Sequence, residues 1–246
     1  MTMRIQRALA RAGVASRRRA EELVAAGRVR VNGAPAQLGQ IVDPALDAIS
    51  VDGAPVRPPA TTQWIVLNKP SGVMTTRADP AGRRTVFDFV PKIPGLTYAG
   101  RLDYLTEGVL LLTNDGAAIH ALLHPSREVE RTYVATVTGD ASKAATQAQR
   151  GVQLPDGVVR LTDVAARPLG GGRWELTVAI TEGRNREVRR LCKALGLFVE
   201  RLVRVRFGPV LLGTLAPGAW RALSEKELEI LTALARAPRQ GMHGPS

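Results

Sequence analysis

One aspartate, Asp103, stands in the part of the sequence best suited to chemistry. It lies in a polar loop bounded by Gly100 and Gly108, and the entirely apolar stretch Val109–Leu112 follows. A buried strand there would hold the loop rigidly, and rigidly held loops are where catalytic side chains gather. A carboxylate in such a place can act as a nucleophile that forms a covalent intermediate. Taken alone, the pattern fits a turn or capping aspartate better, so the surrounding sequence has to decide.

The other reactive side chains form weaker patterns. His120 and His124 have the four-residue spacing of a metal pair, but no glutamate follows His120 and no third ligand is evident. Cys192 is the only cysteine, which excludes a disulfide framework and a cysteine-based zinc site. It lies on the apolar stripe of an expected helix and is interpreted as inert packing. We therefore expect no metal site.

The basic side chains are concentrated in two clusters. Lysine and arginine number 34 against 22 acidic residues, a net charge of +12. Residues 1–31 hold eight arginines against two glutamates, and residues 182–206 hold seven arginines and one lysine against three glutamates. Either cluster alone could be a solvated helix face, but two together favour contacts with the phosphates of a nucleic acid. In the first cluster the expected contacts are Arg4, Arg17, Arg18, Arg19, Arg28 and Arg30.

Residues 1–53 are predicted to form a small basic domain. The sequence predicts a helix over 4–12, a second helix over 17–26 with Ser16 as its N-cap, and a strand over 28–31 that meets the turn Asn32-Gly33. The order Ser16-Arg17-Arg18, Ala20-Glu21, Leu23, Gly27-Arg28-Val29 and Val31-Asn32-Gly33 resembles the RNA-binding module of the ribosomal protein S4 family. Its arginines would grasp the phosphates of folded RNA by shape.

A proline-rich connector, 54–63, is expected to lead into a larger domain over 64–236, with a flexible tail at 237–246. Strands and helices mix there without regular alternation, which predicts an α+β fold with a mainly antiparallel mixed sheet flanked by helices. A capping box, Ser224 and Glu227, predicts the start of the last helix. The expected strands are 64–68, 109–113, 132–138, 174–181 and 198–205, and the other helices are 117–123 and 186–195.

Five segments of this larger domain carry a resemblance that changes the interpretation of Asp103. In order they are Leu67-Asn68-Lys69-Pro70-Ser71-Gly72, Gly100-Arg101-Leu102-Asp103-Tyr104-Leu105-Thr106-Glu107-Gly108, Arg131-Thr132-Tyr133-Val134, Glu182-Gly183-Arg184-Asn185-Arg186-Glu187-Val188-Arg189-Arg190-Leu191, and Arg201-Leu202-Val203-Arg204-Val205-Arg206-Phe207-Gly208. The series resembles the motifs of RNA pseudouridine synthases of the RsuA/RluB type. With the N-terminal module, the resemblance covers roughly residues 3–235.

The resemblance implies roles for individual side chains. Asp103 matches the catalytic aspartate, Tyr133 the tyrosine that stacks on the target base and helps to remove a proton from ring carbon 5, and Arg189 the basic residue that pairs with the aspartate. Leu202 matches the apolar residue beneath the base. The remaining expected substrate contacts are Arg101 and Thr106, which shape the loop, Arg186 and Arg190, and Lys69, whose role the resemblance leaves unassigned.

The implied reaction is the isomerisation of uridine to pseudouridine in ribosomal RNA, which needs no redox partner and therefore no cofactor. The segment Arg184-Asn185-Arg186-Glu187-Val188-Arg189-Arg190 looks closest to members that act on 23S rRNA of the large subunit, and a 16S target is the alternative. A non-catalytic rRNA-binding or ribosome-assembly protein and a DNA-binding helix–turn–helix regulator are rival interpretations. The first has no need of the trio Asp103, Tyr133 and Arg189, and the second leaves the larger domain unexplained. No apolar run approaches about 18 residues, so we expect no membrane span and a cytoplasmic monomer.

Overall fold

A computed structural model gives the fold, and it describes residues 2–57, 59 and 61–236. The chain forms two compact units. The first contains the N-terminal residues up to Trp64 together with Pro91–Thr97 and Leu112–Ala117. The second contains Ile65–Val90, Tyr98–Leu111 and the chain from Ala118 onward. The predicted tail, 237–246, lies outside the described residues.

The N-terminal elements follow the predicted order. Ser16 caps α2 by accepting a hydrogen bond from the Arg19 amide at 3.2 Å, and Ile5 and Leu9 of α1 are fully buried. Asn32 and Gly33 have φ values of 51° and 83°, the left-handed conformation that a tight hairpin requires. The elements are β1 (Met3–Arg4), α1 (Ile5–Arg11), α2 (Arg17–Ala25), β2 (Val29–Val31), β3 (Ala34–Pro35), β4 (Ile41–Val42), β5 (Ile49–Val51) and β6 (Ala54–Pro55).

The small sheet extends into the segment expected to be a connector. Strand β6 pairs with β5, and the Val56 amide donates to the Ile49 carbonyl at 2.8 Å. Val56 also packs against the core of this unit, so burial and pairing hold the chain to the sheet through residue 56. The expected connector start at residue 54 is therefore too early. Residues 58 and 60 lie outside the described part of the chain.

Two later segments of the chain join the first unit, which the sequence did not indicate. Gly95 approaches the end of α1 so closely that a Cβ there would lie 2.1 Å from the Arg11 carbonyl oxygen. The Asn114 side chain accepts from the Gln63 amide at 2.9 Å and donates to the Thr61 carbonyl at 3.0 Å. Contacts between residues this far apart in the chain leave no local sequence pattern from which they could be predicted.

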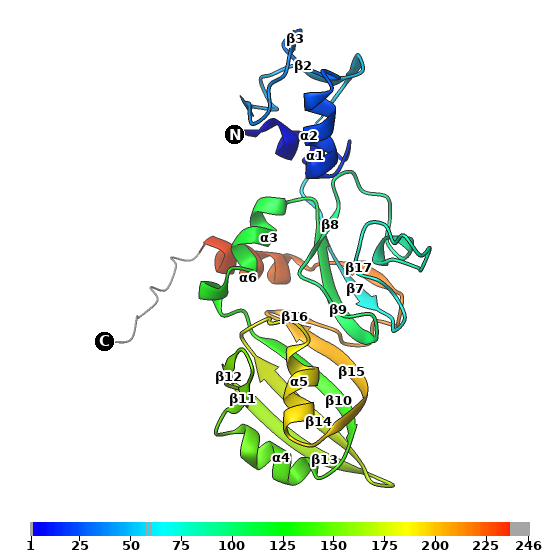
Figure 1. The fold of residues 1–246 in the computed structure, drawn as a ribbon, viewed down its shortest axis with the longest axis vertical. Helices are drawn as coiled ribbons and strands as arrows, with labels where there is room; N and C mark the ends of the chain where they lie inside the picture. Colours follow the sequence, from blue (N-terminus) through cyan, green and yellow to red (C-terminus); the bar gives the residue numbers. More distant parts are fainter. Residues whose placement is uncertain (1, 58, 60, 237–246) are drawn as a thin grey trace, which may run out of the picture. The chain divides into compact units, whose positions relative to one another are not determined.

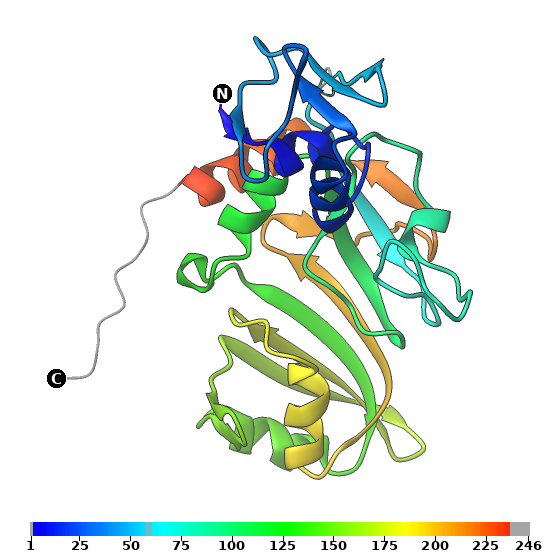
Figure 2. The same cartoon turned by 45° about the horizontal axis from the view of Figure 1, so that its top comes forward.

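The second unit is built on a mixed sheet, as predicted. Its strand order is β13-β14-β10-β15-β9-β7-β17, with β8 beside β9 and β16 beside β15. Strand β10 is antiparallel to both neighbours, whereas β15 and β9 run parallel. Figure 2 shows β10 and β15 side by side over their whole length. The bounds are β7 (Trp64–Lys69), β8 (Thr97–Ala99), β9 (Thr106–Thr113), β10 (Arg131–Thr138), β13 (Asp163–Gly170), β14 (Arg173–Ile180), β15 (Phe198–Phe207), β16 (Val210–Leu211) and β17 (Trp220–Ala222).

Strands β9 and β15 meet at a position that only glycine can occupy. Gly108 lies opposite Arg204, and a Cβ at Gly108 would be 2.1 Å from the Arg204 carbonyl oxygen. The φ of Gly108 is 102°, a conformation that side-chain-bearing residues rarely adopt. Close backbone contact therefore joins the strand that follows the Asp103 loop to the strand that carries Leu202 and Arg204.

Helices cover parts of this sheet (Figure 1). Helix α5 packs against β11 and β15, and Val188, Leu191 and Cys192 of its predicted apolar stripe (Val188, Leu191, Cys192 and Leu195) are buried, while α4 packs on β13. The predicted capping box starts α6, with Ser224 and Glu227 bonded reciprocally. No described helix is long and apolar enough to cross a membrane. The remaining elements are α3 (Gly116–Leu122), α4 (Ala141–Ala148), α5 (Glu187–Ala194), α6 (Glu225–Arg236), β11 (Val152–Leu154), β12 (Gly157–Val159), and the 3-10 helices η1 (Val86–Asp88) and η2 (Pro125–Arg127).

Candidate active site

A cavity of about 640 Å³ lies in the second unit and brings four distant segments together. Asp103 comes from the loop before β9, Tyr133 from β10, Arg189 from α5 and Leu202 from β15, and all four line the cavity. Its size is in the usual range for a small-ligand pocket. The three side chains expected to do chemistry, and the apolar residue expected beneath a base, therefore share one cavity.

The loop that carries Asp103 is fixed by backbone contacts. The Lys69 ammonium, fully buried, donates to the carbonyl oxygens of Pro70, Tyr104 and Thr106 at 3.1, 3.2 and 2.8 Å. Burial lowers the pKa of Lys69 from 10.5 to about 8, while the carboxylates of Glu107 and Asp103 oppose that shift. Lys69 does not line the cavity, so its place in the structure is beneath the loop rather than against a ligand.

A second anchor holds the other side of the loop. The Thr75 hydroxyl donates to the Leu102 carbonyl at 2.8 Å, and the Thr106 amide donates to the Asp103 carbonyl at 3.0 Å. The Asp103 side chain itself remains 31% exposed. The backbone on both sides is therefore held while the carboxylate stays accessible from the cavity.

The basic residue paired with Asp103 differs from the one expected. Arg186 Nη1 lies 3.8 Å from Asp103 Oδ2, whereas Arg189 Nη2 donates to the Leu105 carbonyl at 3.1 Å. Arg186 is the N-cap of α5 and has a left-handed φ of 50°. Burial lowers the pKa of Arg189, with nearby Arg186 as a smaller cause, and the Asp103 carboxylate opposes the shift. Arg189 therefore shares the surroundings of Asp103 without the expected ion pair.

Of the remaining residues expected to contact substrate, two line the cavity and one is bound by a carboxylate outside it. Arg101 and Thr106 line the cavity, Arg101 exposed and Thr106 buried. Arg190 does not line it, because its guanidinium is bound by both carboxylate oxygens of Asp156, at 2.9 and 2.8 Å. The expectation that Arg190 contacts substrate is therefore not supported by this geometry.

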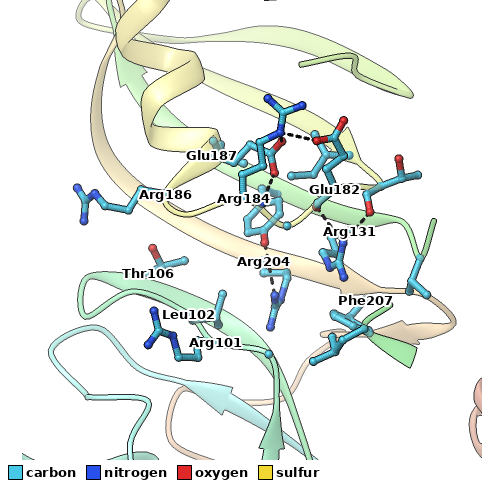
Figure 3. A pocket seen from close by; sticks show the side chains of 18 of the residues that line it. Arg101, Leu102, Thr106, Arg131, Glu182, Arg184, Arg186, Glu187, Arg204 and Phe207 are labelled. Atoms are coloured by element: carbon cyan, nitrogen blue, oxygen red, sulfur yellow. Dashed lines mark hydrogen bonds and ion pairs between the residues drawn. The ribbon is translucent and has the colours of Figure 1, made fainter. Parts of the chain in front are cut away.

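An arginine-aromatic stack that the sequence did not single out forms one wall of the cavity (Figure 3). Arg131 and Arg204 each hold a guanidinium carbon 5.1 Å from the centre of the Phe207 ring. Arg131 donates to the carbonyls of Thr181 and Glu182, both at 2.8 Å. Arg204 donates to the Val109 carbonyl at 2.7 Å and to the Tyr133 hydroxyl at 3.4 Å.

A β-bulge places this stack. Tyr133 pairs with Arg204 and Thr132 with Arg206, so Val205 is an extra residue in β15. Arg204 and Phe207 are three residues apart, and a regular strand would send them to opposite faces. The bulge turns both into the cavity, a common use of bulges beside active sites.

The loop before α5 forms the rim above this wall. Arg184 Nε is bonded to Glu182, and its amide donates to Glu187 Oε2 at 3.1 Å. Glu187 is buried, and that burial raises its pKa. Figure 3 shows Glu182, Arg184 and Glu187 grouped on one side of the cavity, with Arg186 directed away from them.

The six N-terminal arginines expected to bind RNA are all exposed. Arg19 is paired with Glu22 and Arg28 with Asp52, and Arg30 donates to the Gly33 carbonyl. Arg4, Arg17 and Arg18 form no ion pair with any residue that the structure describes. Their guanidinium groups are therefore available to an external anion.

The residues considered for metals and thiol chemistry form no such site. Among residues 2–57, 59 and 61–236, no three histidine, cysteine or acidic side chains are grouped to hold a metal ion. Cys192 is buried, and that burial raises the pKa of its thiol to about 12. A thiol held protonated in this way is a poor nucleophile.

Comparisons with known proteins give matches to both parts of the chain. Residues 63–194 match the family model described as RNA pseudouridylate synthase, and residues 3–46 match the S4 domain. The chain is 44% identical over 242 residues to "Ribosomal large subunit pseudouridine synthase B" of Vibrio cholerae, covering 95% of this chain and 75% of that protein. The same-named protein of Pseudomonas aeruginosa is also 44% identical, and the match spans 61% of its length.

A mycobacterial relative and a solved structure also match nearly the whole chain. An uncharacterized RNA pseudouridine synthase of Mycobacterium tuberculosis is 44% identical over 232 residues, covering 92% of this chain and 91% of that protein. A solved structure titled "Crystal structure of pseudouridylate synthase" matches with a TM-score of 0.63 and 27% identity, covering 93% of this chain and 99% of that one. The chain therefore belongs to the RNA pseudouridylate synthase family and carries an S4 domain at its N-terminal end.

Proposed function

We propose that this enzyme converts specific uridines of 23S ribosomal RNA to pseudouridine in the cytoplasm, with Asp103 as the nucleophile. The observation that carries the proposal is the position of Asp103, accessible in a cavity that also contains Tyr133 and the buried Leu202. Relatives that are 44% identical over more than nine-tenths of this chain are named for the large ribosomal subunit, which favours 23S rRNA as the substrate.

The chemistry assigns a role to each part of the cavity. The Asp103 carboxylate forms a transient bond with the nucleotide, at the ribose anomeric carbon or on the uracil ring, and the bond from ring nitrogen 1 to the ribose breaks. The base turns so that carbon 5 is joined to the ribose, and the proton on carbon 5 leaves. Tyr133 stacks on the base and receives this proton, while Leu202 forms the apolar floor that holds the detached ring.

Two arginines bring positive charge to the surroundings of Asp103. Arg189 and Arg186 lie on the side of α5 nearest the loop, and Arg186 Nη1 is 3.8 Å from Asp103 Oδ2. Thr106 supports the loop from β9, and Arg101 on the exposed rim contacts the RNA beside the target. The target uridine has to leave its stack to reach the cavity, as the bases modified by other enzymes do.

The N-terminal module supplies affinity rather than chemistry. Its exposed arginines contact phosphates, which position RNA without reading its sequence. Arg17 and Arg18 project from α2, a helix whose opposite face is buried through Ala20, Leu23 and Val24. The module would therefore grip the folded rRNA while the cavity receives one nucleotide.

The decisive experiment replaces Asp103 by Asn. Pseudouridines are mapped chemically in rRNA from cells with the native protein, with no protein and with the Asp103→Asn variant, and Asp163→Asn serves as a control on an exposed carboxylate of the edge strand β13. We expect at least one 23S position to lose its pseudouridine without the protein and with Asp103→Asn, and to keep it with Asp163→Asn. Normal modification by Asp103→Asn would overturn the role of Asp103, and a lost position in 16S rRNA would replace the proposed substrate.

A further inference from the structure

Arg204 is a buried cation with no anionic partner among the residues that the structure describes. Its side chain is 3% exposed, and no carboxylate in the described part of the chain forms an ion pair with it. Arg131 is also buried against Phe207, and the charge of Arg204 adds to the burial that lowers the pKa of Arg131. Burying a charge without a partner is costly, so the position of Arg204 requires an explanation.

The contacts of Arg204 point to the Tyr133 hydroxyl as the group it serves. Its Nε donates a hydrogen bond to the Val109 carbonyl at 2.7 Å, which attaches the guanidinium to β9. Its Nη1 reaches Tyr133 Oη at 3.4 Å, and its Nη2 is buried with no hydrogen-bond acceptor among the described residues. Tyr133 Oη is thus the one side-chain oxygen that the described structure places in hydrogen-bond contact with this cation.

A guanidinium only donates hydrogen bonds, which fixes the role of the phenol oxygen in this pair. Tyr133 Oη accepts from Arg204, so its own proton is directed elsewhere and a lone pair is oriented by the cation. Negative charge on the same oxygen would be stabilised by a hydrogen-bond donor that is already in place. The 3.4 Å separation would shorten as that charge develops, because charge-assisted hydrogen bonds are shorter than neutral ones.

The geometry points to Arg204 as a positioning residue that enables the Tyr133 oxygen to accept the proton from carbon 5 of the base. This inference rests on the proposed function. In the step concerned, the electron pair of the C5–H bond restores the C5=C6 double bond of the ring, and the proton moves to the Tyr133 phenolate. The phenolate forms beforehand by loss of its proton to water, and ring nitrogen 1, freed from the ribose, gains a proton, so the isomerisation is balanced.

A double-mutant cycle tests whether Arg204 acts through the hydroxyl. Single-turnover rates of pseudouridine formation are measured for the native enzyme, Arg204→Met, Tyr133→Phe and the double variant, at saturating enzyme. General acid–base groups contribute about 10²–10⁴-fold, so we expect Arg204→Met to lower the rate by about 10²-fold in the native background and by less than about 2-fold with Tyr133→Phe. An equal loss in both backgrounds would show a structural role and overturn the inference.

A blocked substrate separates this step from the earlier ones. RNA with 5-fluorouridine at the target has no proton on carbon 5, so reaction stops before the step assigned to Tyr133. We expect Arg204→Met to rearrange this RNA to the fluorine-retaining C-glycoside at the native rate and Asp103→Asn not to rearrange it. Slow rearrangement by Arg204→Met would overturn the inference, whereas rearrangement by Asp103→Asn would overturn the proposed function instead.

The conservative variant Arg204→Lys controls for an effect of misfolding in Arg204→Met. Arg204→Lys keeps the charge but cannot bond to Val109 and Tyr133 in the same geometry, so we expect it to recover about tenfold of the rate lost in Arg204→Met. Its thermal unfolding is compared with that of the native protein. If Arg204→Met does not fold, Arg204→Lys is used in the same cycle, and a loss of rate that is the same with and without the Tyr133 hydroxyl overturns the inference.

Discussion

Arg17 and Arg204 place the same side chain in opposite surroundings. Arg17 lies on α2 of the first unit, exposed and without an ion pair among the described residues, whereas Arg204 is buried in the second unit and bonded to a backbone carbonyl and a phenol. An exposed cation is screened by salt and attracts any phosphate, while a buried one is hardly screened and acts only on its immediate contacts. We therefore expect Arg17 to affect RNA binding and Arg204 to affect the chemical step. This difference can be tested by mutating the two units independently.

The largest expected effect belongs to the arginine beside the Asp103 loop. Arg189→Met should lower the rate at saturating RNA by about 10²–10³-fold, the usual cost of removing a preorganised electrostatic contact, with little change in RNA affinity. Its neighbour Arg190→Met is the matched control, because Asp156 already binds that guanidinium outside the cavity. We expect less than about a twofold change for Arg190→Met. If Arg189→Met lowered RNA affinity more than the rate, Arg189 would be a phosphate contact, and the assignment of chemistry to the second unit would be contradicted.

The second expected effect is the pH dependence that Lys69 imposes on stability. The pKa of Lys69 is about 8 in the folded protein and near 10.5 when unfolded, so the unfolded chain binds more protons between these values. The contribution of Lys69 to the free energy of unfolding should therefore rise with pH across that window, by about 3 kcal/mol in total. The check is denaturant unfolding of the native protein and Lys69→Met at pH 7.5, 9 and 10.5. A constant difference between the two proteins would contradict it.

The smallest expected effect concerns the first unit. Replacing Arg17 and Arg18 together by Ala should weaken RNA binding about tenfold at moderate salt, and the slope of log affinity against log salt should fall by about 1 for each phosphate that is no longer bound. The rate at saturating RNA should not change. Arg28→Ala is the control, because Asp52 already holds that guanidinium at 2.8 and 2.5 Å, and we expect a smaller loss of affinity. An unaltered salt slope for the double variant would remove this helix from the RNA surface.

Sequence patterns predicted the parts of the molecule with local signals. Ser16 and the Ser224–Glu227 box marked helix starts because capping depends on neighbouring residues, and the apolar stripe of α5 marked its buried face. Helix α4 and strand β13 were missed. The exposed edge strand carries little apolar alternation, and α4 is buried mainly through small alanines.

The wall of the cavity shows why the remaining site residues were harder to predict. Arg204 and Phe207 lie in the last of the five motifs, and the alternation of side chains along a regular strand would place them on opposite faces of the sheet. The extra residue Val205 brings them to the same face. Arg186, which pairs with Asp103, has a left-handed φ that residues with side chains seldom adopt. Arg190 was expected at the cavity from its place in a basic motif, whereas a carboxylate 34 positions away along the chain captures it. Such features depend on backbone irregularities and distant partners.

The contact at Gly108 has a consequence for how this enzyme could diversify. Because β9 and β15 touch there without room for a methyl group, the spacing between the Asp103 loop and the strand bearing Leu202 is set by main-chain atoms. Mutations elsewhere on the surface could then redirect the protein to new sites in RNA without retuning the reaction. Any substitution at Gly108 itself would widen the junction and shift the Asp103 loop relative to Leu202, so this position does not tolerate gradual change.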